Sequence, residues 1–356
     1  MLENEITKLL NINYPIIQAP MAGGIATCSL VAAVSNNGAL GMIGAGYMSP
    51  IQLREQIREV KQLTSNNFGV NLFVPGEFEI FENDVEMANS LLNRFREELN
   101  IHEEKITLPN MENAFQSYME QIQVVIEEKV PICSFTFGVP NADIVAEFKL
   151  EGIISIGTAT TVEEAVSIEK LGMDVVVLQG SEAGGHRGNF LSGHEESLIG
   201  LMSLIPQVAD NVCIPIVAAG GIMDGRGLMA ALNLGAKAVQ MGTAFLTCEE
   251  SGANPLHKEA IMHSKDGDTT FTRAFSGKWA RGIKNKFIME MEEHEDSFPN
   301  FPVQNSLTQL IRKESAIQNN IEYMSLWSGQ SAALARIETV EELVKRVMDE
   351  ARKVNR

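Results

Sequence analysis

Short apolar runs alternate with helical patterns between Tyr14 and Leu246. Eight of the runs are apolar almost throughout, which is typical of parallel strands that are covered on both faces. These runs are Pro15–Ala19, Ala39–Ile43, Phe68–Phe73, Ile132–Phe135, Ile153–Ile156, Val175–Gln179, Ile214–Ala218 and Ala238–Met241. The helical patterns between them include Ser29–Asn36, Pro50–Leu63, Ala142–Lys149, Thr161–Leu171 and Gly225–Leu234. Eight strand–helix units in this span predict an α/β protein with a (β/α)₈ TIM barrel rather than a doubly wound sheet.

Two segments do not fit this repeat. The third and fourth strands are separated by far more residues than a usual connection, so we expect an insertion at about Gly76–Asn110, near the barrel mouth. Cys248–Arg336 follows the last strand and is expected to form a helical cap. We therefore expect a barrel at 1–247, a cap and substrate region at 248–336, and a C-terminal helix at 337–356 that packs on the barrel.

The composition is that of a globular protein, with 45% hydrophobic and 21% charged residues. A formal net charge of -18 repels nucleic-acid phosphates and anionic membrane surfaces, so neither is an expected partner. There is no secretory signal and no apolar run of about 18 residues, which is the length a spanning helix needs. The four cysteines form no CxxC pair, which predicts reduced, buried thiols in a cytoplasmic protein.

Glycines follow the last two predicted strands, at the end of a barrel where active sites lie. Gly220 and Gly221 come after the seventh strand, and Gly242 and Thr243 come after the eighth. Loops at these positions bind phosphate through backbone N–H groups, without needing a lysine. Two such turns favour a phosphate-bearing ligand over the alternative that the glycines only end strands. A GxGxxG motif is absent from the first strand–helix unit, so a Rossmann site is not expected.

His186 lies in a glycine-flanked loop after the sixth strand. Imidazole exchanges protons near neutral pH, so His186 is the candidate acid or base, the alternative being a surface loop histidine. The other five histidines have polar or charged neighbours and are expected at the surface. No histidine has metal-ligand spacing to a second ligand, so we expect no metal. Asn71, an amide in an apolar strand, is either a satisfied core residue or part of the site.

Five motifs at the strand ends together resemble the nitronate monooxygenases. They are QAPM (18–21), GVNLF (69–73), QGSEAGGHRG (179–188), IPIVAAGGI (214–222) and QMGTAF (240–245), and LWSGQSA (326–332) extends the resemblance along essentially the whole chain. The resemblance implies an FMN cofactor across the barrel mouth. Its phosphate would lie on Gly220, Gly221, Gln240, Met241, Gly242 and Thr243, and its ring system near Met21, Asn71, Gln179 and Gly184.

The resemblance also implies the chemistry. His186 would be the catalytic residue, which takes the α-proton of a neutral nitroalkane or stabilises a preformed nitronate. The implied reaction converts a small nitronate and O₂ to a carbonyl compound and nitrite. Propionate 3-nitronate is the implied substrate and detoxification the implied role. A homodimer is left open.

For the basic residues of the predicted mouth and cap, the sequence leaves two possible roles open. Arg187 either attracts a carboxylated nitronate or is exposed to solvent. The run GKWARGIKNK, which contains Lys278, Arg281, Lys284 and Lys286, is either a solvated helix face or the source of a side chain that reaches the substrate carboxylate.

Flavin-type enoyl-acyl-carrier-protein reductases, which use NAD(P)H, share the EAGGH loop, the AAGGI turn and a Q-x-GT strand end. The QAPM motif, the insertion and the long cap favour the monooxygenase over this alternative. A third alternative is a flavin- or phosphate-binding barrel that acts as a sensor without turnover, and His186 at the mouth argues against it.

Overall fold

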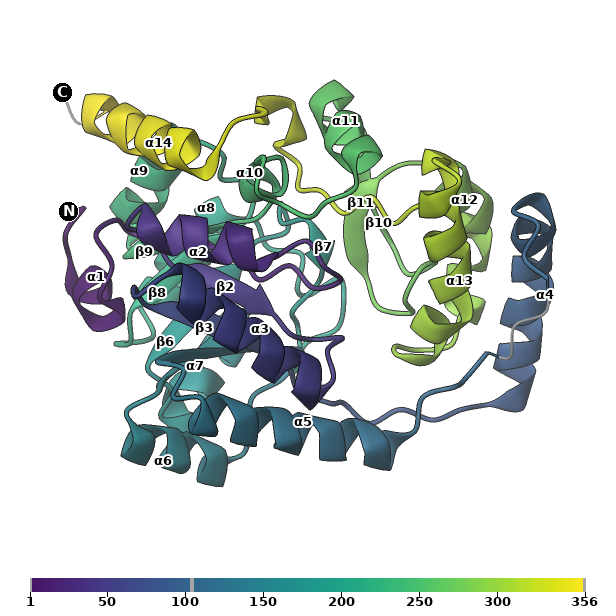
Figure 1. Cartoon of the computed structure of the whole chain (residues 1–356), viewed down its shortest axis with the longest axis horizontal. Helices are drawn as coiled ribbons and strands as arrows, with labels where there is room; N and C mark the ends of the chain where they lie inside the picture. Colours follow the sequence, from purple (N-terminus) through teal and green to yellow (C-terminus); the bar gives the residue numbers. More distant parts are fainter. Residues whose placement is uncertain (1, 103–105, 355–356) are drawn as a thin grey trace.

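A computed structural model places all eight predicted strands in one parallel sheet (Figure 1). The structure describes residues 2–102 and 106–354, so residue 1, residues 103–105 of the expected insertion and residues 355–356 lie outside the described residues. The spatial order of the strands is β1 (Ile16–Gln18), β9 (Ala238–Met241), β8 (Ile216–Ala219), β6 (Val175–Gln179), β5 (Ile154–Ala159), β4 (Ile132–Thr136), β3 (Phe68–Phe73) and β2 (Gly41–Gly44).

The sheet closes into a barrel between β1 and β2. Leu40, just before β2, forms a parallel bridge with Ile17. The Leu40 N–H donates to the carbonyl of Ile16, and the Gln18 N–H donates to the carbonyl of Leu40, both at 2.9 Å. The fully buried Gln18 side chain adds a third link, because its Oε1 accepts the Met42 N–H at 2.9 Å. The predicted (β/α)₈ barrel is confirmed.

Helices surround the barrel, and α1 (Glu5–Leu10) lies at the end of the barrel that is on the left in Figure 1. This helix contributes Ile6 and Leu10 to the apolar cluster inside the barrel, where they pack with strand residues such as Val175. The outer helices are α2 (Cys28–Asn36), α3 (Pro50–Leu63), α5 (Met111–Glu127), α6 (Ala142–Glu151), α7 (Val162–Leu171), α8 (Leu201–Ala209) and α9 (Gly225–Leu234). No helix in the described ranges has the length and apolarity that a bilayer span requires.

The final helix, α14 (Val340–Val354), packs against α9. Its Glu350 carboxylate accepts the Gly225 N–H at 3.0 Å. The contact is so close that a Cβ on Gly225 would lie 2.3 Å from the Ala351 backbone nitrogen. Glycine at this position therefore sets how closely the two helices approach.

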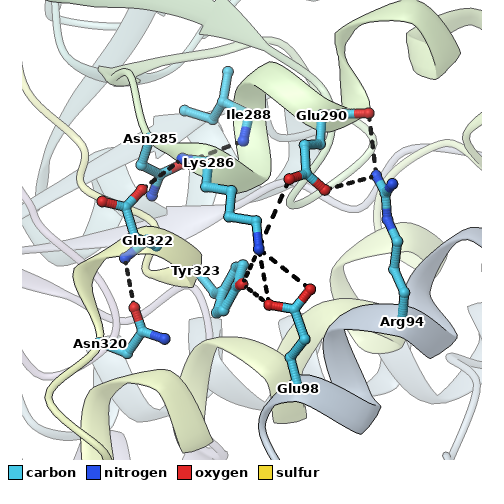
Figure 2. Close-up of polar contacts among 9 residues, drawn as sticks. All are labelled: Arg94, Glu98, Asn285, Lys286, Ile288, Glu290, Asn320, Glu322 and Tyr323. Atoms are coloured by element: carbon cyan, nitrogen blue, oxygen red, sulfur yellow. Dashed lines mark hydrogen bonds and ion pairs between the residues drawn. The ribbon is translucent and has the colours of Figure 1, made fainter.

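The insertion and the cap share one hydrophobic cluster. Helix α4 (Glu82–Glu98) of the insertion contributes Leu92 and Phe95, and the cap contributes Phe287 from α12 (Lys286–Met291) and Leu307 from α13 (Val303–Ile317). Figure 2 shows the polar contacts beside this cluster. The Lys286 ammonium lies 2.8 Å from the Glu98 carboxylate, and Arg94 pairs with Glu290 at 3.1 Å. An insertion between β3 and β4 and the segment that follows β9 thus form one lobe over the barrel mouth.

The cap also contains a sheet that the sequence pattern did not predict. Strand β11 (Ala280–Ile283) pairs antiparallel with β10 (Thr269–Thr272) on one side and with β7 (Gly185–His186) on the other. The middle of the run at 277–286 is therefore a strand, Ala280–Ile283, with irregular residues around it, and not the helix face that was one alternative. The pairing of His186 with Ala280 joins the loop that follows β6 to the cap. The remaining cap elements are α11 (Pro255–His263), η1 (Glu292–Ser297), η2 (Ile321–Tyr323) and η3 (Ala332–Leu334), after the short α10 (Thr243–Leu246).

Candidate active site

A cavity of about 360 Å³ lies at the carboxyl ends of the barrel strands, beneath the cap. Of the candidate residues predicted from the sequence, those that line it are Met21, Asn71, Gln179, Gly184, His186, Gly220, Gly221, Gln240, Gly242 and Thr243. Met241 is the exception. Its side chain is 1% exposed in the barrel core, and its carbonyl accepts the Ala19 N–H at 2.8 Å.

The turns after β8 and β9 present unused backbone donors to the cavity. Gly220 and Gly221 adopt φ values of +143° and +64°, which L side chains rarely adopt. Within the described residues, the N–H groups of Gly221, Ile222 and Gly242 donate to no protein acceptor. An anion with several oxygens would satisfy such donors, so this corner of the cavity fits a phosphate group.

The segment around LWSGQSA closes the same corner from the cap side. The Gly329 N–H donates to Thr243 Oγ1 at 3.0 Å, and a Cβ on Gly184 would lie 2.5 Å from the Gly329 nitrogen. Ser331 also lines the cavity, and its Oγ lies 3.2 Å from the place a Cβ on Gly221 would take. LWSGQSA is recognisable in the sequence, but its contact with the glycine turns follows only from the fold.

Two amide side chains hold the walls of the cavity. Asn71 Nδ2 donates to Ser134 Oγ at 2.9 Å and to Thr136 Oγ1 at 3.0 Å. Asn71 is thus satisfied and also lines the cavity, so it combines both alternatives. Gln179 binds the loop that carries His186, since its Nε2 donates to the His186 carbonyl at 2.9 Å and its Oε1 accepts the Gly188 N–H at 2.8 Å.

A serine of the cap favours one tautomer of His186. The His186 Nε2 lies 2.8 Å from Ser276 Oγ, and that hydroxyl lies within hydrogen-bond distance of the Lys278 carbonyl, at 3.0 Å. A hydroxyl that donates to Lys278 accepts from Nε2–H, so this geometry favours the Nε2–H tautomer. Ser276 is buried and does not line the cavity, which leaves Nδ1 as the ring nitrogen with a lone pair for a ligand.

Aromatic rings surround His186. Its ring centroid lies 5.4 Å from that of Trp327, 5.8 Å from Phe137 and 6.1 Å from Phe301. Burial among them, together with the positive charges of Lys278 and Arg312, lowers the pKa of His186 from its usual range to about 3. The imidazole is therefore neutral at pH 7, with a lone pair on one ring nitrogen, but it is a weaker base than a free histidine.

The basic residues near His186 are neither simply exposed to solvent nor, apart from Arg312, placed in the cavity. Arg187 is fully buried, and it donates to the carbonyls of Gly180 at 2.7 Å and Ser197 at 2.6 Å. It therefore neither contacts solvent nor is available to a substrate carboxylate. Arg281 lies over the Phe271 ring and donates to Ser181, Lys284 donates to Gly267, and Lys286 pairs with Glu98. Lys278 lies 5.0 Å from the Phe137 ring centroid, behind the cavity wall.

Two expectations about side-chain exposure are wrong. His257 is 5% exposed, with Nε2 3.0 Å from the Trp327 carbonyl, and His194 stacks on Trp279 at 4.2 Å. Their helical or loop neighbours are polar, but the cap folds over both rings. Cys213 is exposed rather than buried, although all four thiols are free.

Tyr47, Phe137, Arg312 and Trp327 also line the cavity and were not identified as site residues. Trp327 lies in the LWSGQSA motif, which gave a sequence signal. Arg312 gave none, because a single arginine in an amphipathic helix usually faces solvent. Its place in the cavity depends on how α13 docks over the barrel.

A closed (β/α)₈ barrel with unused backbone donors and a neutral histidine at its mouth is typical of a barrel enzyme that binds an anionic ligand. Residues 3–350 match the sequence model of the family described as Nitronate monooxygenase. The chain belongs to this family and is an oxidoreductase, which confirms the resemblance seen in the motifs.

Similar proteins support this assignment along the full length. A probable nitronate monooxygenase of Staphylococcus haemolyticus (strain JCSC1435) is 51% identical over 351 residues, which cover 98% of this chain and 97% of that protein. Nitroalkane oxidase from Streptomyces ansochromogenes superposes with a TM-score of 0.90 at 37% identity, covering 98% of both chains. FabK from Thermotoga maritima gives 0.78 at 31% identity, covering 100% of this chain and 98% of that one.

Proposed function

We propose that this enzyme binds FMN in the cavity and uses O₂ to convert alkyl nitronates to a carbonyl compound and nitrite. The observation that carries the proposal is one cavity in which unused N–H groups at Gly221, Ile222 and Gly242 lie together with the neutral imidazole of His186. FMN, when bound, would accept the electrons that the nitronate loses.

The residues present fit this cofactor. Its phosphate would be held at Gly220, Gly221, Gln240, Gly242 and Thr243, beside the free N–H groups of Gly221, Ile222 and Gly242. Met241 could contribute only its backbone, because its side chain is buried in the barrel. The ring system would lie near Met21, Asn71, Gln179 and Gly184, which line the cavity.

His186 acts differently on the two forms of the substrate. With a neutral nitroalkane, its Nδ1 lone pair accepts the α-proton, as the Nε2–H bond to Ser276 requires. With a preformed nitronate no proton has to leave, and the side chain positions the anion. The charges of Lys278 and Arg312, which disfavour an imidazolium, favour an anionic substrate at the same place.

We further propose that the substrate is propionate 3-nitronate, that the role is detoxification and that residues 248–336 form the substrate region. The small cavity and its lining by the cap residues Arg312, Ser325 and Trp327 support this. Free thiols suit a reducing compartment, so we propose a cytoplasmic location. The sequence also leaves a homodimer open and predicts that nucleic acid is not a partner, and both statements stay predictions.

The test is to follow the flavin absorbance of the purified protein without oxygen. Bleaching by propionate 3-nitronate, with nitrite formed once oxygen is admitted, is the expected result. Rapid bleaching by NADH, and none by the nitronate, would instead identify a reductase of the enoyl-acyl-carrier-protein type. Protein without flavin would refute the assignment of both glycine turns, and turnover of either substrate would exclude a sensor.

A further inference from the structure

Arg312 is the one residue with a formally charged side chain among the described residues that line the cavity. It extends from α13 of the cap. Its Nη2 donates to the carbonyl of Asn305 at 2.9 Å and to Asn305 Oδ1 at 2.8 Å. Its Nε is buried and has no hydrogen-bond partner in the described chain.

No carboxylate of the described residues lies within ion-pair distance of Arg312. Lys286, by contrast, pairs with Glu98. Arg187 also lacks an ion pair among the described residues and has an unpartnered Nε, but only Arg312 of the two lines the cavity. Burial lowers the pKa of Arg312, but a guanidinium stays protonated at neutral pH. A buried charge without a counter-charge costs folding free energy, so its position points to a missing anion.

The anion that Arg312 can bind is distinct from a phosphate on the glycine turns. Glu182 lies beside those turns, since a Cβ on Gly221 would be 3.2 Å from the Glu182 Cβ. The Glu182 charge raises the pKa of Arg187, whereas the pKa of Arg312 responds to Tyr47 instead. Arg312 in turn acts on His186, so it belongs to the reacting side of the cavity.

We propose that Arg312 binds a second anionic group of the substrate, a carboxylate two carbon–carbon bonds from the nitronate carbon, and thereby selects carboxylated nitronates over alkyl nitronates. Arg312 Nη1 has no hydrogen-bond partner among the described residues and, unlike Nε, is not buried, so it is the free donor for one carboxylate oxygen; guanidinium–carboxylate contacts are strong, directional pairs. The proposal rests on the proposed function, because it assigns the substrate class of the same site.

Two substrates of matched shape separate this role from a general one. Propionate 3-nitronate carries the carboxylate, and 3-methylbutyl nitronate carries an isopropyl group in its place. A hydrogen bond to a charged group contributes about 1.5–3 kcal/mol, which corresponds to about 10–150-fold. Arg312→Met should lower kcat/KM by that factor with propionate 3-nitronate, mainly through KM. The loss with 3-methylbutyl nitronate should be at least tenfold smaller, and Arg312→Lys should recover part of the loss.

The matched control is Lys313→Met, which removes a neighbouring positive charge from the exposed face of α13. It should leave kcat/KM unchanged for both nitronates. Binding of succinate, a dianion of similar length, is measured by calorimetry on the purified enzyme. Arg312→Met should weaken it at least tenfold.

Equal losses on both nitronates, or unchanged succinate binding in Arg312→Met, would overturn the role of Arg312. Wild-type enzyme that binds succinate through Arg312 but turns over neither nitronate would instead overturn the proposed function alone.

Discussion

Replacing Ser276 with alanine tests whether the cap sets the tautomer of His186, the proposed base. The serine is 1% exposed, and its Oγ lies 2.8 Å from His186 Nε2. Ser276→Ala removes the acceptor that favours the Nε2–H tautomer, in which Nδ1 carries the lone pair. We expect the variant to retain its flavin but to populate the inactive tautomer more often.

The magnitude follows from one neutral hydrogen bond. Such a bond contributes about 0.5–1.5 kcal/mol, which corresponds to about 2–10-fold in the tautomer ratio. Ser276→Ala should therefore lower kcat/KM for neutral nitroethane by about 2–10-fold. The loss with ethylnitronate should be smaller, because that substrate has no α-proton for His186 to remove.

The assay compares kcat/KM for nitroethane and ethylnitronate, together with ¹⁵N chemical shifts of labelled histidine, which distinguish the tautomers. Ser264→Ala is the control, since Ser264 is also buried and donates to a backbone carbonyl, that of Ala260, at 2.7 Å. An unchanged tautomer in Ser276→Ala, or equal losses on both substrates, would refute the argument.

Three further predictions concern the base, the glycine turn and the buried histidine of the cap. His186→Asn should keep the flavin absorbance and lower kcat/KM for nitroethane by about 10²–10⁴-fold, with a smaller loss for ethylnitronate; equal losses would contradict a proton-transfer role. Gly221→Ala forces a side chain into φ +64° beside Glu182 and should weaken FMN retention about tenfold by flavin fluorescence, whereas Gly152→Ala, at φ +69° in open space, should not. Burial lowers the pKa of His257 to about 4, so below pH 6.5 the unfolded state binds a proton that the folded state does not, and stability falls with pH until about 4. Urea unfolding should show that His257→Gln removes up to about 2 kcal/mol of the loss between pH 7 and 5; an unchanged loss would contradict the burial argument.

The barrel could be predicted because its information is local. Strands covered on both faces, such as Phe68–Phe73 and Val175–Gln179, are apolar almost throughout, and the structure has both with those bounds. The glycine turns after β8 and β9 were visible for a similar reason, since backbone conformations with positive φ select glycine directly.

The cap sheet could not be predicted because it depends on distant pairing. Strand β7 has two residues, too few for any periodic pattern, and it exists because Gly185 and His186 pair with β11 in the cap. The role of Ser276 follows from the same pairing, which brings a serine ninety positions away next to the imidazole. Likewise, Arg187 and His257 have polar sequence neighbours, and only the folded cap buries them.

The charge of the whole chain and the charge of the cavity have opposite signs, and each affects a different class of ligand. A net charge of -18 opposes a polyanion, which must lie across a wide surface. A small anion that enters the cavity meets Arg312 on the wall and Lys278 behind it, and both charges act on His186. The interaction is strong at this range because apolar rings such as Trp327 keep water away from His186. The same two cations keep the imidazole neutral, although they also make it a weaker base, and they favour a small anion such as a nitronate in the cavity.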